Sequence, residues 1–244
     1  MQSLDEREGE QWALNELLTT DSISDIVKDI ENGTAVAVSD GSFKRNGGTA
    51  AWIIENHTGT QRIMGNVNVP GTVLDQSAYR SEIAGVYGSV LVTEVIKETF
   101  GLERGGILIG YDGKEALKQA IDIEYNIISC QQQHFDLLSG IQGYIKGSCI
   151  RYTAKHIKGH QDTNKSLGEL DSWELLNVEM DMMAKDWWKL QHANAKFVLS
   201  LIKSLLESDS SLAYPQNSVL TILCKHSAKA STSLSAKALT IIEL

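Results

Sequence analysis

The hydrophobic pattern changes its period several times between residues 34 and 157, and this succession limits the possible folds. Short apolar runs typical of strands occupy 34–39, 50–55 and 62–69. From 77 to 100 the apolar residues instead recur every three or four positions, which predicts an amphipathic helix. Three antiparallel strands followed by a helix are therefore expected.

Strand-like and helix-like patterns go on alternating after residue 100. The later patterns predict a strand at 107–111, a short helix at 114–121, a helix at 135–145, a strand at 150–157 and a helix from about 173 to 191. We therefore expect an α/β fold with a five-stranded mixed sheet, in which three antiparallel strands adjoin two parallel ones. Helices should cover both faces of this sheet.

The charge divides the chain into three segments. Residues 1–33 form an acidic, helical leader with nine acidic and two basic residues, while the whole chain has a net charge of −9. The α/β pattern occupies 34–190, and 191–244 is expected to be a helical or partly disordered tail. Such an acidic balance by itself disfavours a nucleic-acid partner, because phosphate binding usually requires a basic surface.

Four acidic residues stand at positions where a core sequence rarely has them. Asp40 and Asp112 end buried strands, Glu82 interrupts the first turns of an apolar helix, and Asp181 lies beside the apolar stripe of the last helix. Each alone is explained by a turn, a helix cap or a solvated helix position. Together, they could converge in a mixed sheet, and converging carboxylates repel one another unless a hard cation such as Mg²⁺ or Mn²⁺ binds.

Five blocks occur in a fixed order along 34–190. They are Ser-Asp40-Gly-Ser, Tyr-Arg80-Ser-Glu82-Ile-Ala, Ile-Gly-Tyr-Asp112-Gly, His156-Ile-Lys158-Gly-His160 and Asn177-x-Glu179-x-Asp181. This ordered set resembles the type 1 ribonuclease H domain. Some details of the first two blocks resemble the ribonuclease H regions of retroelement reverse transcriptases more than those of free-standing enzymes.

The resemblance implies an RNase H-like fold and an endonuclease that hydrolyses the RNA strand of RNA/DNA hybrids by two-metal-ion catalysis. Asp40, Glu82, Asp112 and Asp181 would hold two Mg²⁺ ions, for which Mn²⁺ could substitute. His160 would assist proton movement and product departure.

The resemblance also implies a set of substrate contacts. Main-chain groups after Asp40 and near Glu82 would recognise 2′-hydroxyl groups. The residues expected to contact the substrate are Gly41, Ser42, Arg80, Ser81 and Lys158. Lys155 and Lys165 are further candidates for phosphate contacts.

Two departures from the family pattern stand out. Ala78-Tyr79 replaces an asparagine pair that usually precedes the Arg-x-Glu motif. The 21-residue spacing from His160 to Asp181 is about twice the usual one, so 162–175 resembles an insertion. Two alternatives remain open. One is another nuclease or transposase-like member of the same fold, and the other is a non-catalytic, hybrid-binding remnant of a retroelement, for which these departures leave room.

The expected partner is an RNA/DNA hybrid, together with a reverse transcriptase polymerase domain if the retroelement interpretation holds. We expect a monomer. We also expect no membrane contact, because no apolar run reaches the ~20 residues that cross a bilayer. The first ten residues are too acidic and polar for a secretory signal, so we expect an intracellular protein of the cytoplasm or nucleus.

Overall fold

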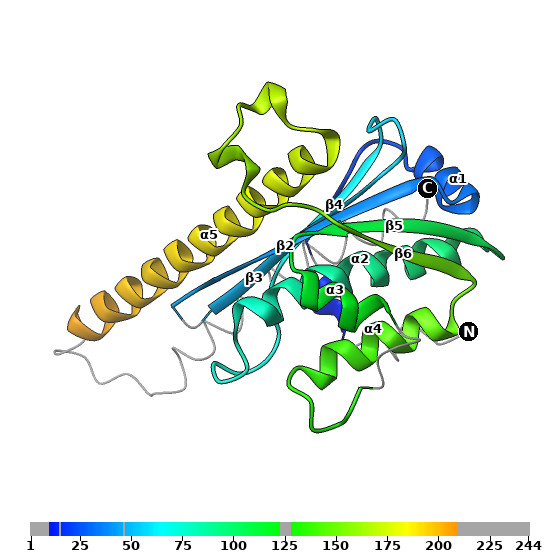
Figure 1. Ribbon diagram of the computed structural model, residues 1–244. Coiled ribbons are helices and arrows are strands. Elements are labelled where there is room, and N and C mark those ends of the chain that lie inside the picture. The colour runs from blue at the N-terminus through cyan, green and yellow to red at the C-terminus, as the bar shows by residue number, and fades with distance from the viewer. Residues whose placement is uncertain (1–9, 15, 46, 123–127, 209–244) are drawn as a thin grey trace. The chain divides into compact units, whose positions relative to one another are not determined.

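The computed structural model describes residues 10–14, 16–45, 47–122 and 128–208 (Figure 1). The part of the tail predicted to be disordered lies outside these residues, as do residues 1–9. The strands are β1 (Leu17–Thr19), β2 (Ala35–Lys44), β3 (Gly47–Glu55), β4 (Arg62–Asn68), β5 (Gly105–Tyr111) and β6 (Ile150–His156). The helices are α1 (Ser24–Asn32), α2 (Ala78–Phe100), α3 (Lys114–Ile121), α4 (Phe135–Gly147) and α5 (Ser172–Ser208).

The described strands form one mixed sheet in the order β1-β4-β3-β2-β5-β6. β2, β3 and β4 make the predicted antiparallel meander. β5 runs parallel to β2, and β6 runs parallel to β5. The predicted kind of sheet is confirmed, but the described sheet has six strands and not five.

The additional strand β1 comes from the segment predicted to be helical. Leu17 lies opposite Gly65 and Thr19 opposite Ile63, so β1 pairs antiparallel with the edge of β4. A three-residue strand is too short to have a detectable alternating pattern, whereas its leucines fit the helical spacing of neighbouring apolar residues. Pairing with β4 therefore decides the conformation of this segment.

Alternate residues of β3 face two separate cores. Trp52 and Ile54 belong to the larger core, which includes residues of α1, α2 and α4. Ala51 and Ile53 face the other side and pack with Leu176 and other residues of α5. Helices thus cover both faces of the sheet, as predicted (Figure 1).

The leader is packed into the domain. Ile26 and Ile30 of α1 are fully buried in the larger core, as is Ala13. Farther toward the N-terminus, the Glu10 carboxylate accepts hydrogen bonds from the hydroxyl groups of Tyr87 and Tyr144. Residues 10–33 therefore belong to the same compact unit as the sheet, and that unit ends at Trp188.

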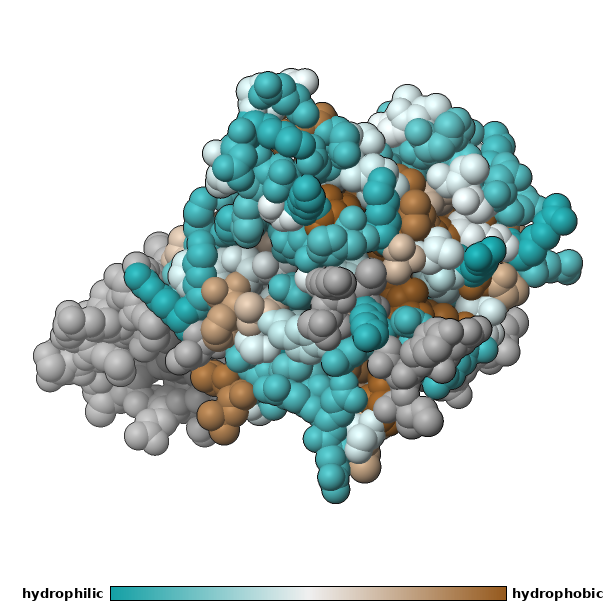
Figure 2. Space-filling model, viewed as in Figure 1, coloured by the Kyte–Doolittle hydropathy of each residue, from teal (hydrophilic) through white to brown (hydrophobic). Residues whose placement is uncertain are grey.

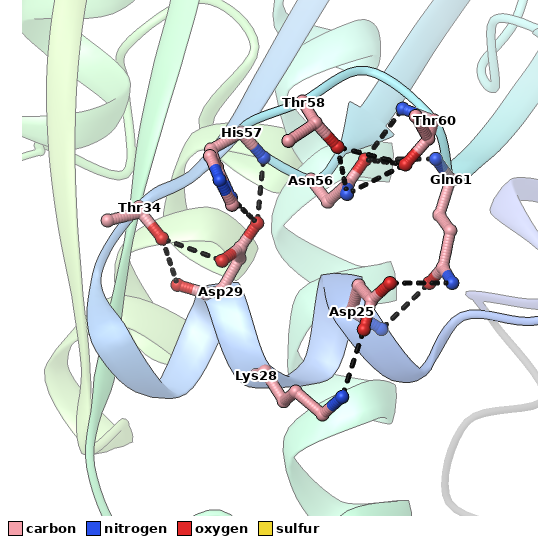
Figure 3. Close-up of polar contacts among 9 residues, drawn as sticks. All are labelled: Asp25, Lys28, Asp29, Thr34, Asn56, His57, Thr58, Thr60 and Gln61. Carbon is pink, nitrogen blue, oxygen red and sulfur yellow. Dashed lines mark hydrogen bonds and ion pairs between the residues drawn. The ribbon is translucent and has the colours of Figure 1, made fainter.

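A polar network joins α1 to the turn between β3 and β4 (Figure 3). The Asp29 carboxylate accepts hydrogen bonds from the His57 backbone N–H and from the Thr34 hydroxyl, at 2.7 and 2.9 Å, and its Oδ2 lies 2.7 Å from His57 Nδ1. The buried Asn56 side chain accepts from the backbone N–H groups of Thr60 and Gln61. The contacts of His57 therefore hold the turn against α1, and those of Asn56 close the turn itself.

β2 continues past the point at which the sequence predicts a turn. Asp-Gly-Ser is a common turn sequence, yet Gly41 and Ser42 pair with Ala50 and Thr49 of β3. Asp40 therefore lies inside a ten-residue strand and not at its end. Antiparallel pairing with β3 outweighs the local turn preference.

The enlarged segment between β6 and α5 contains two capping boxes in succession. Ser166 and Glu169 cap one 3₁₀ turn reciprocally, and the side chains of Asp171 and Glu174 bond to each other's backbone N–H groups at the start of α5. The Lys165 ammonium also donates to both oxygens of Glu174, at 2.6 and 2.8 Å. The apparent insertion is therefore fastened to α5 by its own side chains.

Polar residues cover most of the coloured surface in Figure 2, and the apolar residues there form separate patches. The most exposed large apolar side chain of the described chain is Leu74, on the loop before α2, at 94%. Within the described residues, no helix combines the length and the hydrophobicity needed to span a bilayer.

Candidate active site

β2 and β5 bring two of the predicted acidic residues to adjacent positions. Val38 of β2 lies opposite Gly110 of β5 in the parallel register, and Asp40 and Asp112 each follow two residues later. Side chains two residues apart point to the same face of a sheet, and neighbouring strands lie about 4.8 Å apart. The two carboxylates therefore face the same side of the sheet from neighbouring chain segments.

Glu82 reaches this position because α2 crosses β2 at a glycine. A Cβ atom at Gly41 would lie 2.4 Å from the carbonyl carbon of Ser81 and 2.5 Å from the Glu82 nitrogen, so a larger residue could not fit. The Glu82 carboxylate in turn lies against Gly113, where a Cβ would be 2.1 Å from Oε2. Glu82 thus touches the chain directly after Asp112.

The loop after β6 approaches Asp112 in the same way. A Cβ atom at Gly159 would lie 2.2 Å from the Asp112 Oδ2 atom. The next residue, His160, is exposed and has a left-handed backbone with φ of 52°. Its carbonyl accepts a 2.7 Å hydrogen bond from the Thr163 hydroxyl. This bond shapes the loop internally, and the close approach at Gly159 places the loop beside Asp112.

α5 supplies the fourth acidic residue. Ala184 is buried in the smaller core, and its carbonyl accepts a 2.8 Å hydrogen bond from the Thr49 hydroxyl of β3. One turn before it, Asp181 pairs with Lys185 at 2.5 Å. Lys185 is a cation at the site that the sequence reasoning missed, although its i+4 spacing from Asp181 is a recognisable signal.

The electrostatics of the site couple all four carboxyl groups. Burial raises the pKa of Asp40 to about 8, and the charges of Asp112, Asp181 and Glu82 add to this effect, while only the Gly41 N–H opposes it. Burial, and to a smaller extent the charge of Asp112, raises the pKa of Glu82 to about 7. The other three carboxyl groups therefore lie close enough to Asp40 to oppose its ionisation.

Asp112 has both acidic and basic neighbours. Burial and the Asp181 charge raise its pKa, whereas His160 and His156 act in the opposite direction. The net effect is a raised pKa of Asp112. His160 is therefore near enough to Asp112 to influence its ionisation, as a proton-handling partner would be.

The donor set suits a hard divalent cation, because it consists of carboxylate oxygens whose repulsion a cation would relieve. Even so, within the described ranges no three Asp, Glu, His or Cys side chains form a ready-made metal cage. The carboxylates converge without closing around one point. The ion pair of Asp181 with Lys185 accounts for part of this openness, because it directs Oδ2 of Asp181 toward an ammonium group.

The predicted substrate contacts fall into two groups. Gly41 is half-buried and Lys158 is exposed, so both are accessible beside the carboxylates. Ser42 and Ser81 are buried, and the Ser81 hydroxyl donates to the Ser77 carbonyl at 3.0 Å. Their side chains are therefore enclosed by the protein.

Arg80 is 3% exposed and serves the interior of the domain. Its guanidinium group binds the Asp136 carboxylate and donates to the Pro70 carbonyl at 2.8 Å. It thereby ties the loop before α2 to the start of α4. Of the two lysines proposed as further phosphate contacts, Lys165 is bound to Glu174, and Lys155 lies over the Trp173 ring at 4.1 Å from its centroid.

No protein-family model and no curated protein matches the chain. Solved structures similar to it include LC11-RNase H1 in complex with an RNA/DNA hybrid, at 12% identity and a TM-score of 0.43, covering 56% of this chain and 92% of the other. RNase H1 from Halobacterium salinarum is similar at 15% identity and a TM-score of 0.38, covering 54% and 89% of the two chains. An N-terminal RNase H domain from Mycobacterium tuberculosis is similar at 13% identity and a TM-score of 0.41, covering 66% and 97%. The described sheet, with helices on both of its faces, has the mixed α/β architecture that the sequence predicts.

Proposed function

We propose that this protein is an endonuclease that hydrolyses the RNA strand of RNA/DNA hybrids with the help of divalent metal ions. The observation that carries the proposal is the electrostatic coupling of Asp40 to Asp112, Asp181 and Glu82 on one face of the sheet. A buried carboxylate beside three others that oppose its ionisation is unfavourable without a counter-charge. The sequence motifs that contain these four residues support the same interpretation.

The four carboxylates would hold Mg²⁺, or Mn²⁺ in its place, and a pair of such ions stabilises the attacking and leaving oxygens of a phosphodiester displacement. Asp40 is the most buried of the four, and the charges of all three others raise its pKa. Lys185 would hold the Asp181 side chain in place before the ions bind.

His160 would move a proton at its imidazole ring, because the ring is exposed and its loop lies against Asp112. A neutral imidazole can accept a proton near neutral pH and return it to a departing oxygen. Lys158, two residues earlier and also exposed, would contact a phosphate of the substrate.

Recognition of RNA would depend on main-chain groups at the crossing of β2 and α2. The close contact of Gly41 with Ser81 leaves backbone atoms and not side chains at this point. Backbone donors and acceptors can bind a 2′-hydroxyl group, which DNA lacks.

A second candidate function is hybrid binding without cleavage. The Lys185 ammonium favours it, because the ion pair already neutralises Asp181 and competes with a metal ion for Oδ2. Such a protein would retain the surface that recognises the hybrid but would not hydrolyse it.

The test is hydrolysis of an end-labelled RNA/DNA hybrid by the purified full chain in Mg²⁺ or Mn²⁺. We expect cleavage of the RNA strand and a rate lower by on the order of a thousandfold for Asp40→Asn, because a metal ligand is lost. Asp21→Asn, which changes an exposed aspartate in the same chain, is the matched control and should keep the activity of the unaltered protein. Equal inactivity of all three proteins would reject the enzyme in favour of the binding candidate, and equal cleavage of duplex DNA would indicate a different nuclease.

A further inference from the structure

A second polar site lies at the opposite end of the parallel strands. An open pocket of about 560 Å³ lies where β5 and β6 begin, beside the last turn of α1. Arg104, Arg151 and Thr153 line it, together with Glu31 and the glycines at 33, 105 and 106. β5 runs for seven residues from this pocket toward Asp112, so about 20 Å separates the two sites.

Two arginine side chains line this pocket. Within the described residues neither Arg104 nor Arg151 forms an ion pair, and both are exposed. Guanidinium groups bind phosphate oxygens through two parallel hydrogen bonds. Two free guanidinium groups in one pocket therefore favour a ligand that carries phosphate.

The floor of the pocket consists of main chain. A Cβ atom at Gly106 would lie 3.3 Å from the Cα atom of Gly33, so the two glycines pack backbone against backbone. Side chains would fill this space at either position. A phosphate or sugar can thus approach the floor while the arginines contact it from the rim.

Beyond the pocket, β6 runs toward the carboxylates. Arg151 lies opposite Gly106, Thr153 opposite Leu108 and Lys155 opposite Gly110. Alternate residues of a strand point to the same face and lie about 6.6 Å apart. Because Val36 and Leu108 pair in the same register, this is also the face toward which Asp40 points.

The Lys155 side chain is held in place on this face. Its ammonium group lies 4.1 Å from the centroid of the Trp173 ring, and Trp173 packs against the smaller core. The cations of Arg104, Arg151 and Lys155 therefore form a line from the pocket to the His160 loop. We call this line the β6 track.

We propose that the β6 track binds the phosphodiester backbone of a single nucleic-acid strand that extends beyond the hybrid. Arg151 and Lys155 stand four residues apart on β6, about 13 Å, which suits alternate phosphates of an extended nucleic-acid strand, and the pocket gives the far end of that strand a bidentate anchor. This inference rests on the proposed function, because the strand that it binds is a continuation of the hybrid.

The test measures binding, so that it does not depend on cleavage. The full chain carrying Asp40→Asn is titrated, by fluorescence anisotropy, with a blunt RNA/DNA hybrid and with the same hybrid bearing a single-stranded extension of eight nucleotides at either end. We expect one of the extended hybrids to bind about tenfold more tightly than the blunt one. Arg104→Gln or Arg151→Gln should each remove much of this preference and reduce the slope of log K against log salt by about 0.7.

Two matched variants sharpen the test. Lys28→Gln removes a positive charge from the exposed side of α1, where Lys28 pairs with Asp25, and should leave the preference unchanged. Glu31→Gln removes the acidic group from the pocket and should strengthen binding of the extended hybrid about twofold. Thermal unfolding of each variant shows whether it is folded.

Equal binding of blunt and extended hybrids, or an equal loss in Lys28→Gln and Arg151→Gln, would overturn the inference. Competition by inorganic phosphate or a mononucleotide, without any preference for the extension, would replace it with a site for a small phosphate ligand. A chain that prefers extended hybrids through both arginines but cleaves no hybrid would reject the proposed function alone. A chain that cleaves hybrids and lacks the preference would reject the β6 track alone.

Discussion

Asp29 and Asp40 are both 6% exposed, yet their surroundings shift their ionisation in opposite directions. Burial alone would raise the pKa of Asp29, but hydrogen bonds from His57 and Thr34 lower it (Figure 3). Asp40 has the Gly41 N–H as a donor at 2.6 Å and faces three other carboxyl groups, and its pKa rises to about 8. Burial raises the pKa of both carboxyl groups, and the neighbouring groups decide whether hydrogen bonds offset this rise, as at Asp29, or further carboxylates add to it, as at Asp40.

The difference separates a structural acid from one available for a ligand. Asp29 has donors for both of its oxygens and joins α1 to the β3–β4 turn. Among the described residues Asp40 has a donor on one oxygen alone, the Gly41 N–H, and its charge is tolerated only if a cation or a proton neutralises it. Substitutions at the two positions should consequently change stability with opposite signs.

The largest expected effect on stability is that of Asp29→Ala. The loss of a buried acceptor leaves the His57 N–H and the Thr34 hydroxyl without their partner, and we expect the free energy of unfolding at pH 7 to fall by about 3 kcal/mol. Urea unfolding followed by circular dichroism measures it. The effect should shrink as the pH falls through the lowered pKa of Asp29, because its stabilising contribution is lost there.

Asp25→Ala is the control for that prediction. Asp25 lies on the same helix but is half exposed, where it pairs with Lys28 and accepts from Gln61. Its loss should reduce stability by only about 0.5 kcal/mol. A loss as large as that of Asp29→Ala would mean that both substitutions destabilise α1 itself, and that the loss at Asp29 does not report the removal of a buried acceptor.

Asp40→Asn should have the opposite sign and stabilise the metal-free protein by about 2 kcal/mol at pH 8. Below about pH 4 the carboxyl group is protonated in both states, so no difference is expected there. Between pH 4 and 8 the Asp40 carboxyl group ionises in the unfolded chain but stays protonated in the folded protein. The free energy of unfolding of the wild-type protein therefore falls as the pH rises through this range. Thermal unfolding in EDTA across this pH range measures the difference in stability between the wild type and Asp40→Asn. A destabilised variant would show that the charge of Asp40 is as well compensated by its neighbours as that of Asp29.

Mg²⁺ should increase the stability of the wild-type protein and leave Asp40→Asn nearly unchanged. A ligand that binds only the folded state at ten times its Kd contributes about 1.4 kcal/mol. The melting temperature with and without the ion is the measurement. An equal shift in both proteins would assign the effect to sites elsewhere on the acidic surface.

Thr34→Val is expected to have the smallest effect, a loss of about 1 kcal/mol. It removes one donor from Asp29 Oδ1 and leaves the contacts of His57 with Oδ2 in place. The pKa of Asp29, measured by NMR, should rise toward its ordinary value. An unchanged pKa would show that His57 alone controls this carboxylate.

The sequence predicted the positions of the acidic residues better than their environment. The hydrophobic periods located the strand before Asp112 and the helix that carries Glu82, because those patterns extend over several residues. The continuation of β2 through Asp40 was not predictable locally, because pairing with Ala50 and Thr49 overrides a turn sequence. The convergence of the four carboxylates remained an expectation until the sheet register was known.

Arg80 and Asp29 illustrate why the remaining contacts could not be predicted. Arg80 belongs to a motif that suggests substrate contact, yet its partner Asp136 is 56 residues away in the sequence. Asp29 is separated from His57 by 28 residues and looks like an ordinary solvated acid in a helix. Such partners are set by tertiary packing, and no short pattern encodes them.

The strand β1 has a consequence for the solubility of shortened chains. It pairs with Ile63, Met64 and Gly65 and thereby covers part of the outer edge of β4. A chain that began at Thr34 would expose those backbone groups, and an uncovered edge strand can pair with the same edge of another molecule. Removal of the leader should therefore promote side-by-side association and aggregation, even though every acidic residue of the candidate active site would remain.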